Sequence, residues 1–257
     1  MLDSPRLFSW HAAAVLGLLY VGFPWLAARL RRHRQAVLER SRLELYTQSM
    51  ALQWLATILA LFSARVDGRV ADALSLARRA APGRSALSFW LLLAAAGITL
   101  ALMYLVAGLV QALRSRPRGE DPLVWKLVPE TVAEKCVFAG VALTAGLCEE
   151  FLYRGFAVGR ASLWIPLPLA ALASTLAFTL THIYQGVVGT VRAGALGAVL
   201  LAAFLYTGSL WPGICAHVLF DLVGGLYLGP RWKKNFLQHP VPHDSLLEEK
   251  DREGPRR

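Results

Sequence analysis

The residues best suited to chemistry in this 257-residue chain are the few ionisable ones that interrupt its apolar stretches. Glu149 and Glu150 follow one apolar run, His182 lies near the end of a second, and His217 and Asp221 lie within a third. Ionisable groups inside a bilayer are costly and tend to mark function. Carboxylates and imidazoles together can activate water, so the set is typical of a hydrolase.

Helical spacing predicts different roles for the two adjacent glutamates. Successive residues of an α-helix point about 100° apart, so Glu149 and Glu150 face different directions. Glu150 and Arg154 are four residues apart and can form an ion pair that leaves Glu149 free. The alternative is that both glutamates only cap the interface end of a membrane span.

The two histidines also have a partner four residues away. Phe178 precedes His182 and can orient its imidazole, while Asp221 follows His217 and could hold one ring nitrogen and fix the tautomer. Taken singly, His182 could be an interface anchor and the His217–Asp221 pair a structural hydrogen bond. Three such groups in successive apolar segments are harder to explain as accidents.

The elements that must position these groups are membrane helices. Hydrophobic residues make up 56% of the chain and the mean hydropathy is +0.45, which argues against a soluble protein. Apolar runs of about 20 residues predict an all-α, polytopic bundle of about seven transmembrane helices, with six to eight compatible. The predicted spans are residues 7–28, 44–64, 86–112, 130–150, 164–186, 188–209 and 212–229.

No long polar linker divides the chain before residue 229, so we expect one membrane domain with a short tail. Residues 1–129 are predicted to hold the amino-terminal helices and basic loops, and 130–229 the catalytic core. Residues 230–257 are predicted to be a polar, disordered tail. Residues 68–80 form either a helix lying in the membrane interface or a plain polar loop.

Charge and composition indicate the surroundings of the protein. The net charge of +10 comes mostly from arginines between apolar runs, which predicts contact with anionic lipid headgroups, and no pattern suggests nucleic acid. Basic first and third loops predict an outward amino terminus, although the second loop is also basic. The chain has 22 arginines and 5 lysines, which suggests a GC-rich bacterium and hence its inner membrane. The three cysteines lie in apolar segments and predict no disulfide framework.

Together the three polar groups resemble the motifs of the CPBP family, which comprises CAAX proteases and bacteriocin-processing enzymes and is also called Abi. The resemblance covers about residues 130–229 and rests on Glu149-Glu150-x-x-x-Arg154, Phe178-x-x-x-His182 and His217-x-x-x-Asp221. It implies an integral-membrane endopeptidase with an active site inside a helical bundle. Its substrate would be a peptide precursor, a lipid-linked peptide or a membrane-protein segment.

The resemblance also implies roles for these residues. Glu149 would be the general base that activates water, with His182 assisting, and His217 with Asp221 would stabilise the oxyanion. Glu150, Arg154 and Phe178 would support them. The Ras-converting CAAX endopeptidases have asparagine where this chain has Asp221. An ionised aspartate cannot donate a hydrogen bond, so we expect Asp221 to orient His217 instead.

The sequence leaves an alternative open for the cofactor and another for the class of function. Glu149, His182 and His217 could hold zinc, but the chain has no His-Glu-x-x-His helix, and a metal-free reaction needs the same residues. We therefore expect no cofactor, with zinc as the alternative. A non-catalytic immunity or chaperone protein of the same fold remains a rival, and a transporter is a weaker one.

The predicted spans contain one geometric conflict. They put Glu149 near the outer end of the fourth span and His182 near the inner end of the fifth, separated by much of the membrane. Joint catalysis needs distances on the scale of a hydrogen bond. We therefore expect one boundary to be wrong: either the fourth helix continues past Arg154, or the fifth begins later and runs beyond His182.

Overall fold

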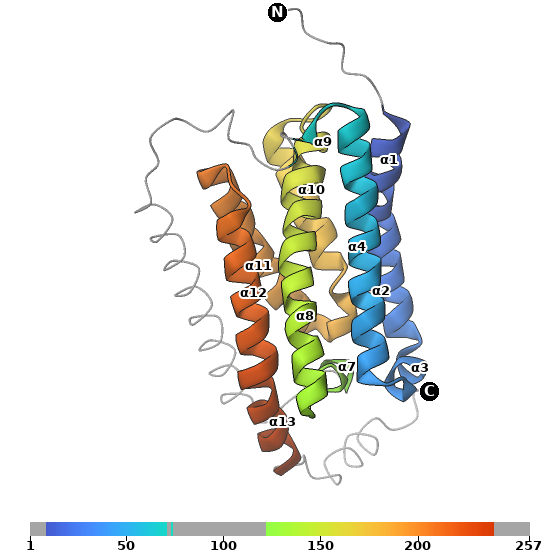
Figure 1. Cartoon of the computed structure of the whole chain (residues 1–257), viewed down its shortest axis with the longest axis vertical. Coiled ribbons are helices and arrows are strands. Elements are labelled where there is room, and N and C mark those ends of the chain that lie inside the picture. Colours follow the sequence, from blue (N-terminus) through green and yellow to red (C-terminus); the bar gives the residue numbers. More distant parts are fainter. Residues whose placement is uncertain (1–8, 71–72, 74–121, 239–257) are drawn as a thin grey trace, which may run out of the picture.

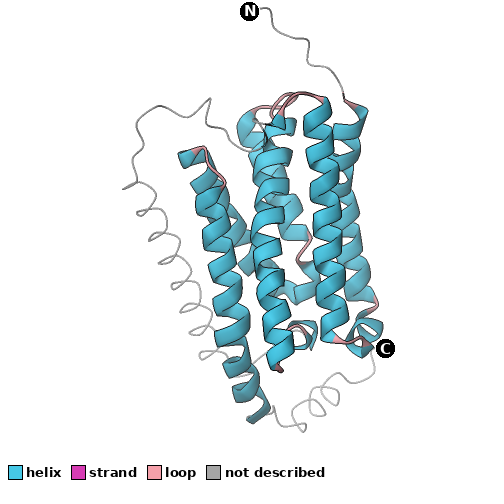
Figure 2. Ribbon diagram, viewed as in Figure 1, coloured by secondary structure: helices cyan, strands magenta, loops and turns pink. Residues whose placement is uncertain are grey.

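The computed structural model describes residues 9–70, 73 and 122–238, which form an all-helical bundle with one long axis (Figures 1 and 2). Five of the described helices are long and apolar enough to cross a membrane. The all-α, polytopic membrane fold is therefore confirmed. The predicted span 86–112, most of the predicted interfacial segment 68–80, and tail residues 239–257 lie outside the described residues.

Two long amino-terminal spans lie side by side. The first consists of α1 (Trp10–Gly17), the π-helical turn η1 (Leu18–Gly22) and α2 (Phe23–Arg32). After the short helix α3 (Arg34–Glu39), the chain returns through α4 (Arg42–Val66), whose N-cap Ser41 accepts a hydrogen bond from the backbone of Glu44. The first span runs four residues past the predicted end at residue 28, and the second extends the predicted 44–64 by two residues at each end.

The central span is longer than predicted. After the one-turn helix α7 (Pro122–Lys126), it continues without a break through α8 (Val132–Glu149), the π-helical segment η2 (Glu150–Val158) and α9 (Gly159–Ala161). A capping box starts it, in which Thr131 and Glu134 each bond to the other's backbone N–H. The predicted end at residue 150 was wrong, because the apolar pattern continues on both sides of the polar pair.

The next helix is short. The described helix α10 (Leu167–Leu180) covers only part of the predicted span 164–186, and the 3-10 turn η3 (Ile183–Gln185) follows it. Gly186 has φ of +79°, a conformation that side chains with a Cβ rarely adopt, and it allows α11 (Gly186–Thr207) to reverse direction inside the bundle. Gly186 therefore marks the point where the chain turns, after the short helix α10 and the turn that carries His182.

The last span runs beyond its predicted end. It consists of α12 (Trp211–Leu222), the π-helical segment η4 (Val223–Leu228) and α13 (Gly229–Gln238). The tail predicted to be disordered from residue 230 therefore begins with helix up to Gln238. Charged residues near this end continue the helix beyond the apolar run, which is why hydropathy alone ended it too early.

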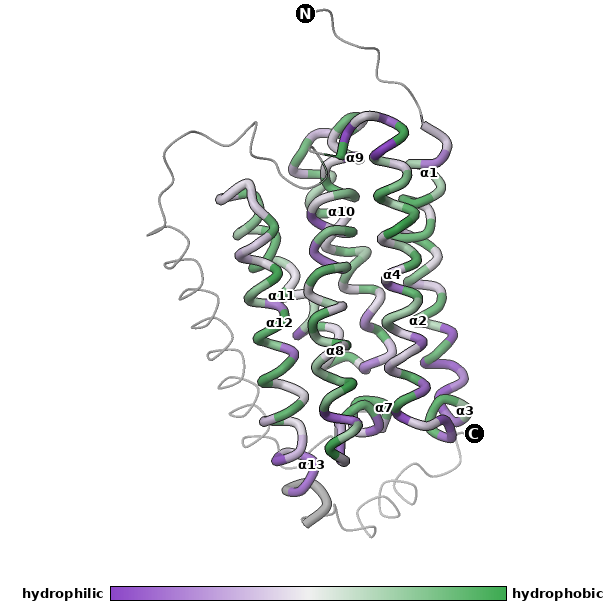
Figure 3. The backbone as a smooth tube through the Cα atoms, in the orientation of Figure 1, coloured by the Kyte–Doolittle hydropathy of each residue, from purple (hydrophilic) through white to green (hydrophobic). Residues whose placement is uncertain are grey.

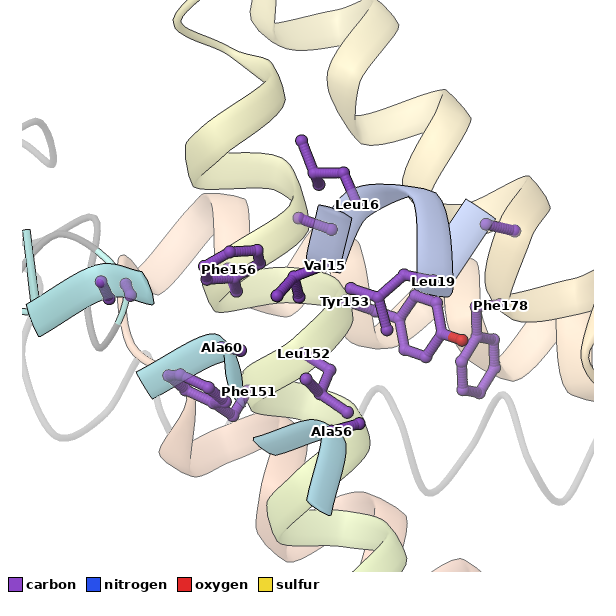
Figure 4. Packing of buried hydrophobic residues seen from close by; sticks show 14 of the residues in the cluster. Val15, Leu16, Leu19, Ala56, Ala60, Phe151, Leu152, Tyr153, Phe156 and Phe178 are labelled. Atoms are coloured by element: carbon purple, nitrogen blue, oxygen red, sulfur yellow. The ribbon is translucent and has the colours of Figure 1, made fainter. Parts of the chain in front are cut away.

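The core lies between the first span, α4 and the central span. Figure 4 shows aromatic side chains of η2, including Phe151 and Phe156, against small or aliphatic residues such as Val15, Ala56 and Ala60. Phe178 of α10 lies against Tyr153, with ring centroids 5.4 Å apart. Alanine on α4 lets the helices approach closely, as is common in membrane bundles.

Ion pairs and hydrogen bonds connect the helices at both ends of the bundle. At the lower end of Figure 1, Arg42 pairs with Glu130 at 2.9 Å and with Glu134 at 3.3 Å, and Lys233 also binds Glu130. The hydrogen bond from Lys233 lowers the pKa of Glu130. At the other end, Asp67 pairs with Arg160.

Basic residues gather at that lower end. Hydrophilic residues colour the region of α3 and α13 in Figure 3, where the first loop and the last helix contribute Arg29, Arg31, Arg32, Arg34, Arg231, Lys233 and Lys234. The two basic clusters lie at one end of the bundle, as the predicted orientation requires. The side of the membrane on which they lie stays a prediction.

Close packing between α8 and α12 gives a first prediction. A Cβ at Gly146 would lie 2.4 Å from Cγ2 of Val218, whose branched side chain has little freedom to move. Gly146→Ala should therefore destabilise the protein by about 1–3 kcal/mol. Gly140→Ala on the same helix meets only Met50 Sδ at 3.6 Å and should be neutral or stabilising. Thermal unfolding in detergent measures both; equal midpoints would contradict this packing.

Candidate active site

The four residues predicted to be catalytic line one cavity. It has a volume of about 290 Å³, lies within the bundle and is bounded by α4, α7, α8, α11 and the last span. Glu149, His182, His217 and Asp221 all contribute to its wall. The extension of the central helix past Arg154 resolves the conflict between the predicted spans, because it places Glu149 deep within the bundle, where the short α10 brings His182.

Glu149 has one satisfied and one unsatisfied carboxylate oxygen. Oε1 accepts a hydrogen bond of 3.1 Å from Nε2 of Gln53 on α4. Oε2 is buried and has no hydrogen-bond partner among the described residues, with His217 Nε2 3.8 Å away. A buried polar atom without a partner is unusual and needs an explanation. This oxygen is free to bind a water or a substrate group.

Glu150 points the other way and joins two buried residues. Its Oε1 lies 3.1 Å from NH1 of Arg154 and 2.9 Å from Nδ1 of His217. The side chains of Glu150, Arg154 and His217 are 1%, 2% and 4% exposed. The predicted ion pair between Glu150 and Arg154 is confirmed, and the same carboxylate also holds the histidine.

Glycine lets α12 approach this network. A Cβ at Gly213 would lie 2.8 Å from Oε2 of Glu150, so only glycine leaves room for the carboxylate. Arg154 donates from NH2 to the backbone oxygen of Gly197 at 3.0 Å, and its guanidinium lies 4.4 Å from the ring centroid of Phe178. The buried cation therefore has an anion, a carbonyl and an aromatic face as neighbours.

His182 is held in one tautomer. Its Nδ1 lies 2.9 Å from the backbone oxygen of Phe178, which can only accept, so Nδ1 carries the proton. The ring of Phe178 lies against the imidazole with a centroid distance of 4.7 Å, as the four-residue spacing predicted. Nε2 of a neutral His182 is thereby left with its lone pair.

The orienting contact to His217 comes from Glu150, which differs from the expectation for Asp221. Asp221 Oδ2 lies 3.9 Å from His217 Nε2, too far for a hydrogen bond, whereas Glu150 bonds to Nδ1. Sequence spacing pointed to the i, i+4 neighbour on the same helix. The actual partner lies 67 residues away on the central span, which spacing alone cannot detect.

Helical irregularities accompany the site. The central helix changes from α to π geometry at Glu150, directly after Glu149, and the last span does so at Val223, directly after the turn that carries Asp221. π-Helical turns are uncommon and occur often at functional sites. They widen the helix where the polar residues must point inward.

A second, smaller cavity meets the same residues from another side. It has a volume of about 130 Å³ and lies between α2 and α4. Glu149, His182, Gln53 and Tyr184 line both cavities. Its other walls are mainly apolar side chains, including Phe23 and Leu26. The candidate site therefore lies where two cavities of different character meet.

The zinc alternative lacks a ligand set in the described part of the chain. No group of three or more His, Cys, Asp and Glu side chains there is arranged to hold a metal ion. Glu149, His182 and His217, the ligands of the zinc alternative, line one cavity.

Sequence reasoning missed Gln53, the donor to Glu149, and the cavity residues Tyr184 and Arg192. Gln53 could have been found, because it is an amide within an apolar run and lies four residues after Ser49, to which it also donates at 3.4 Å. Tyr184 follows His182 too closely to share its helical face. It reaches the site only because the chain turns at η3.

The buried network gives a second prediction. Glu150→Gln removes the anion that faces Arg154 and should destabilise the protein by about 3–5 kcal/mol, because an uncompensated charge stays buried. Glu149→Gln is the matched control: its glutamine can still accept from Gln53, and no arginine depends on it. Melting in detergent should show a clear loss for the first variant only. Equal losses would contradict the assignment of Glu150 as the structural partner.

The comparisons with known proteins agree with the motif pattern. Residues 132–223 match the family model described as type II CAAX prenyl endopeptidase, Rce1-like. No curated protein and no solved structure matches the chain. The matched stretch begins at the start of α8, ends within η4 and contains all three motifs. Over these residues, which make up less than half of the chain, the protein is similar to the Rce1-like family of CAAX prenyl endopeptidases.

Proposed function

We propose that the protein is an intramembrane endopeptidase that hydrolyses a peptide bond of a membrane-associated or lipid-linked substrate. The observation that carries this proposal is the shared cavity of Glu149, His182, His217 and Asp221. The family match, which implies a peptidase, supports it. The unsatisfied Oε2 of Glu149 supports it further, because a general base needs an oxygen that is free to bind water.

In the proposed reaction, Glu149 takes a proton from water as the water oxygen attacks the scissile carbonyl carbon. Gln53 holds the other carboxylate oxygen and so keeps Oε2 toward the cavity. The carbon–oxygen bond forms, the carbonyl oxygen becomes an oxyanion, and the proton rests on Glu149. Glu149 then gives this proton to the leaving nitrogen as the carbon–nitrogen bond breaks, so atoms and charge balance.

His182 assists by positioning the same water. Its Nδ1–H is committed to the backbone oxygen of Phe178, so Nε2 can accept a hydrogen bond from water. Two acceptors, Oε2 and Nε2, then hold the two water protons and aim the oxygen lone pair at the carbonyl. This arrangement explains why both residues belong on one cavity wall.

His217 serves the oxyanion. Glu150 accepts from Nδ1, and a doubly protonated ring would direct its Nε2–H at the developing negative charge. Asp221 lies beside the same nitrogen at 3.9 Å. It can hold the imidazolium in place, or donate itself when protonated. This reaction needs no metal, and every step uses residues of the chain.

The matching family is named for endopeptidases that act on prenylated CAAX sequences. For this chain we propose a membrane-bound peptide, either a prenylated tail, a bacteriocin leader or a segment of a membrane protein. We also propose a bacterial inner membrane as its location. The basic lower end of the bundle would contact anionic lipid headgroups there.

A third prediction tests the base. Glu149→Gln should lower cleavage by about 10²–10⁴-fold, because the amide keeps the volume and loses the base. The assay uses protein in proteoliposomes, a farnesyl-cysteine CAAX peptide and a mass-spectrometric library of membrane peptides. If the protein is non-catalytic, the wild-type protein will cleave none of these peptides. Variant activity above a tenth of wild type would exclude Glu149 as the base.

A fourth prediction concerns Asp221 and the metal. Asp221→Asn should keep activity within about tenfold of wild type, because an amide can donate to the oxyanion and Glu150 still holds His217. Asp221→Leu, which is similar in size but has no polar atom, should be much less active. Chelators should leave wild-type activity unchanged. Stoichiometric zinc in the purified protein that is lost in His182→Ala and His217→Ala would return the site to a zinc hydrolase.

A further inference from the structure

A tyrosine at the junction of the two cavities has a hydrogen-bond donor that the fold does not use. Among the described residues, Tyr184 is the only tyrosine that lines both cavities. Its hydroxyl oxygen accepts a hydrogen bond of 3.0 Å from Nε2 of Gln185, and its own proton has no acceptor in the described part of the chain. The other tyrosine of the larger cavity, Tyr46, donates to the backbone oxygen of Leu127 at 2.7 Å. Only the proton of Tyr184 is therefore left for a ligand.

The turn that carries Tyr184 is held on two sides. Arg31 of α2 donates from NH1 to the backbone oxygen of Ile183 at 2.9 Å. Thr190 of α11 donates to the backbone oxygen of His182 at 3.1 Å. The phenol ring lies beside the imidazole of His182, with an angle of 25° between the planes and 6.3 Å between the centroids. Tyr184 is thus positioned before a substrate arrives, as a donor that stabilises a transition state must be.

The groups around the phenol are mainly acceptors. Glu149 and Asp221 line the same cavity from two different spans, and both carboxylates are close enough to interact electrostatically with the Tyr184 hydroxyl. Neither accepts its proton, and Oε2 of Glu149 has no partner among the described residues. The acceptor for Tyr184 would therefore come with the substrate, whose peptide bond brings a carbonyl oxygen into the cavity.

We propose that Tyr184 donates its phenolic hydrogen bond to the carbonyl oxygen of the scissile bond and stabilises the oxyanion together with His217. This inference rests on the proposed peptidase function and adds a second donor to it. An oxyanion has lone pairs for more than one donor, and two donors are common in oxyanion holes. The hydrogen bond from Gln185 polarises the hydroxyl and makes its proton a better donor.

The attacking water is a less suitable acceptor for this proton. In the proposed reaction its two hydrogens are held by Oε2 of Glu149 and Nε2 of His182. A donor at the water oxygen would occupy electrons that the attack on the carbonyl carbon needs. The carbonyl oxygen instead gains negative charge as the new bond forms, so a donor there binds the transition state more strongly than the substrate. Such a contact raises kcat and leaves KM nearly unchanged.

The first test removes the hydroxyl. Tyr184→Phe in proteoliposomes, assayed with the best-cleaved peptide of the library, should lower kcat by about 10²-fold and leave KM within about threefold of wild type. Tyr227→Phe is the matched control, because it removes an exposed hydroxyl outside both cavities and should keep the wild-type kcat. An unchanged kcat in Tyr184→Phe would overturn the inference while leaving the peptidase function intact.

A second variant separates the donated proton from the contact with Gln185. Tyr184→O-methyltyrosine, introduced by genetic code expansion, keeps the ring and an oxygen that can accept from Gln185, but it cannot donate. It should lose as much kcat as Tyr184→Phe. Wild-type kcat in this variant would show that the proton is not needed and would overturn the inference.

Binding of two uncleavable peptides gives a readout that a merely structural role would not move. One carries a difluoroketone at the scissile bond, whose hydrate resembles the tetrahedral intermediate, and the other carries a methylene group there. Tyr184→Phe should weaken binding of the ketone by about tenfold or more and leave binding of the methylene peptide unchanged. Equal weakening of both would assign Tyr184 to structure and overturn the inference. Wild type that cleaves no library peptide would overturn the peptidase function as well.

Discussion

A single buried carboxylate, that of Glu150, joins the parts of the site. It faces Arg154 on its own helix and His217 on the last span, and all three side chains are almost completely buried. A charge in this environment is tolerable only with a partner, so the three residues depend on one another. The central span, α11 and α12 are thereby fixed at the level where Glu149 meets the cavity.

The division of work between two adjacent glutamates follows from this network. Glu150 is satisfied by its buried partners and has little freedom to react, whereas Glu149 keeps an oxygen without a partner. Helical geometry turns the two side chains apart, and the onset of π-helix at Glu150 accommodates both. Glu150 thus holds the surrounding helices together, and its neighbour Glu149 supplies the reactive carboxylate.

The sequence predicted this site well where the contacts are local. The pair of Glu150 with Arg154 and the contact of Phe178 with His182 follow from four-residue spacing, and both are present. Within the described residues, hydropathy located the spans but not their ends, because the central helix carries its polar residues in its middle.

Contacts between distant elements could not be predicted in this way. The partner of His217 is 67 residues away, and Gln53 reaches Glu149 across 96 residues. Such pairs depend on how helices pack, which the spacing of residues along the chain does not reveal. The turn at Gly186, which brings Tyr184 and α11 to the site, likewise could not be predicted from residue spacing.

The shortness of α10 has a consequence for the surrounding lipid. Its 14 residues rise about 21 Å, whereas a hydrocarbon core is about 30 Å thick. Leu169, Leu172 and Leu176 are each more than half exposed along this helix. Lipid against that face must thin or compress to match it, at a cost of fractions of a kcal/mol for each ångström. A bilayer thinned beside this helix, which ends two residues before His182, would shorten the path that water must cover to reach the site.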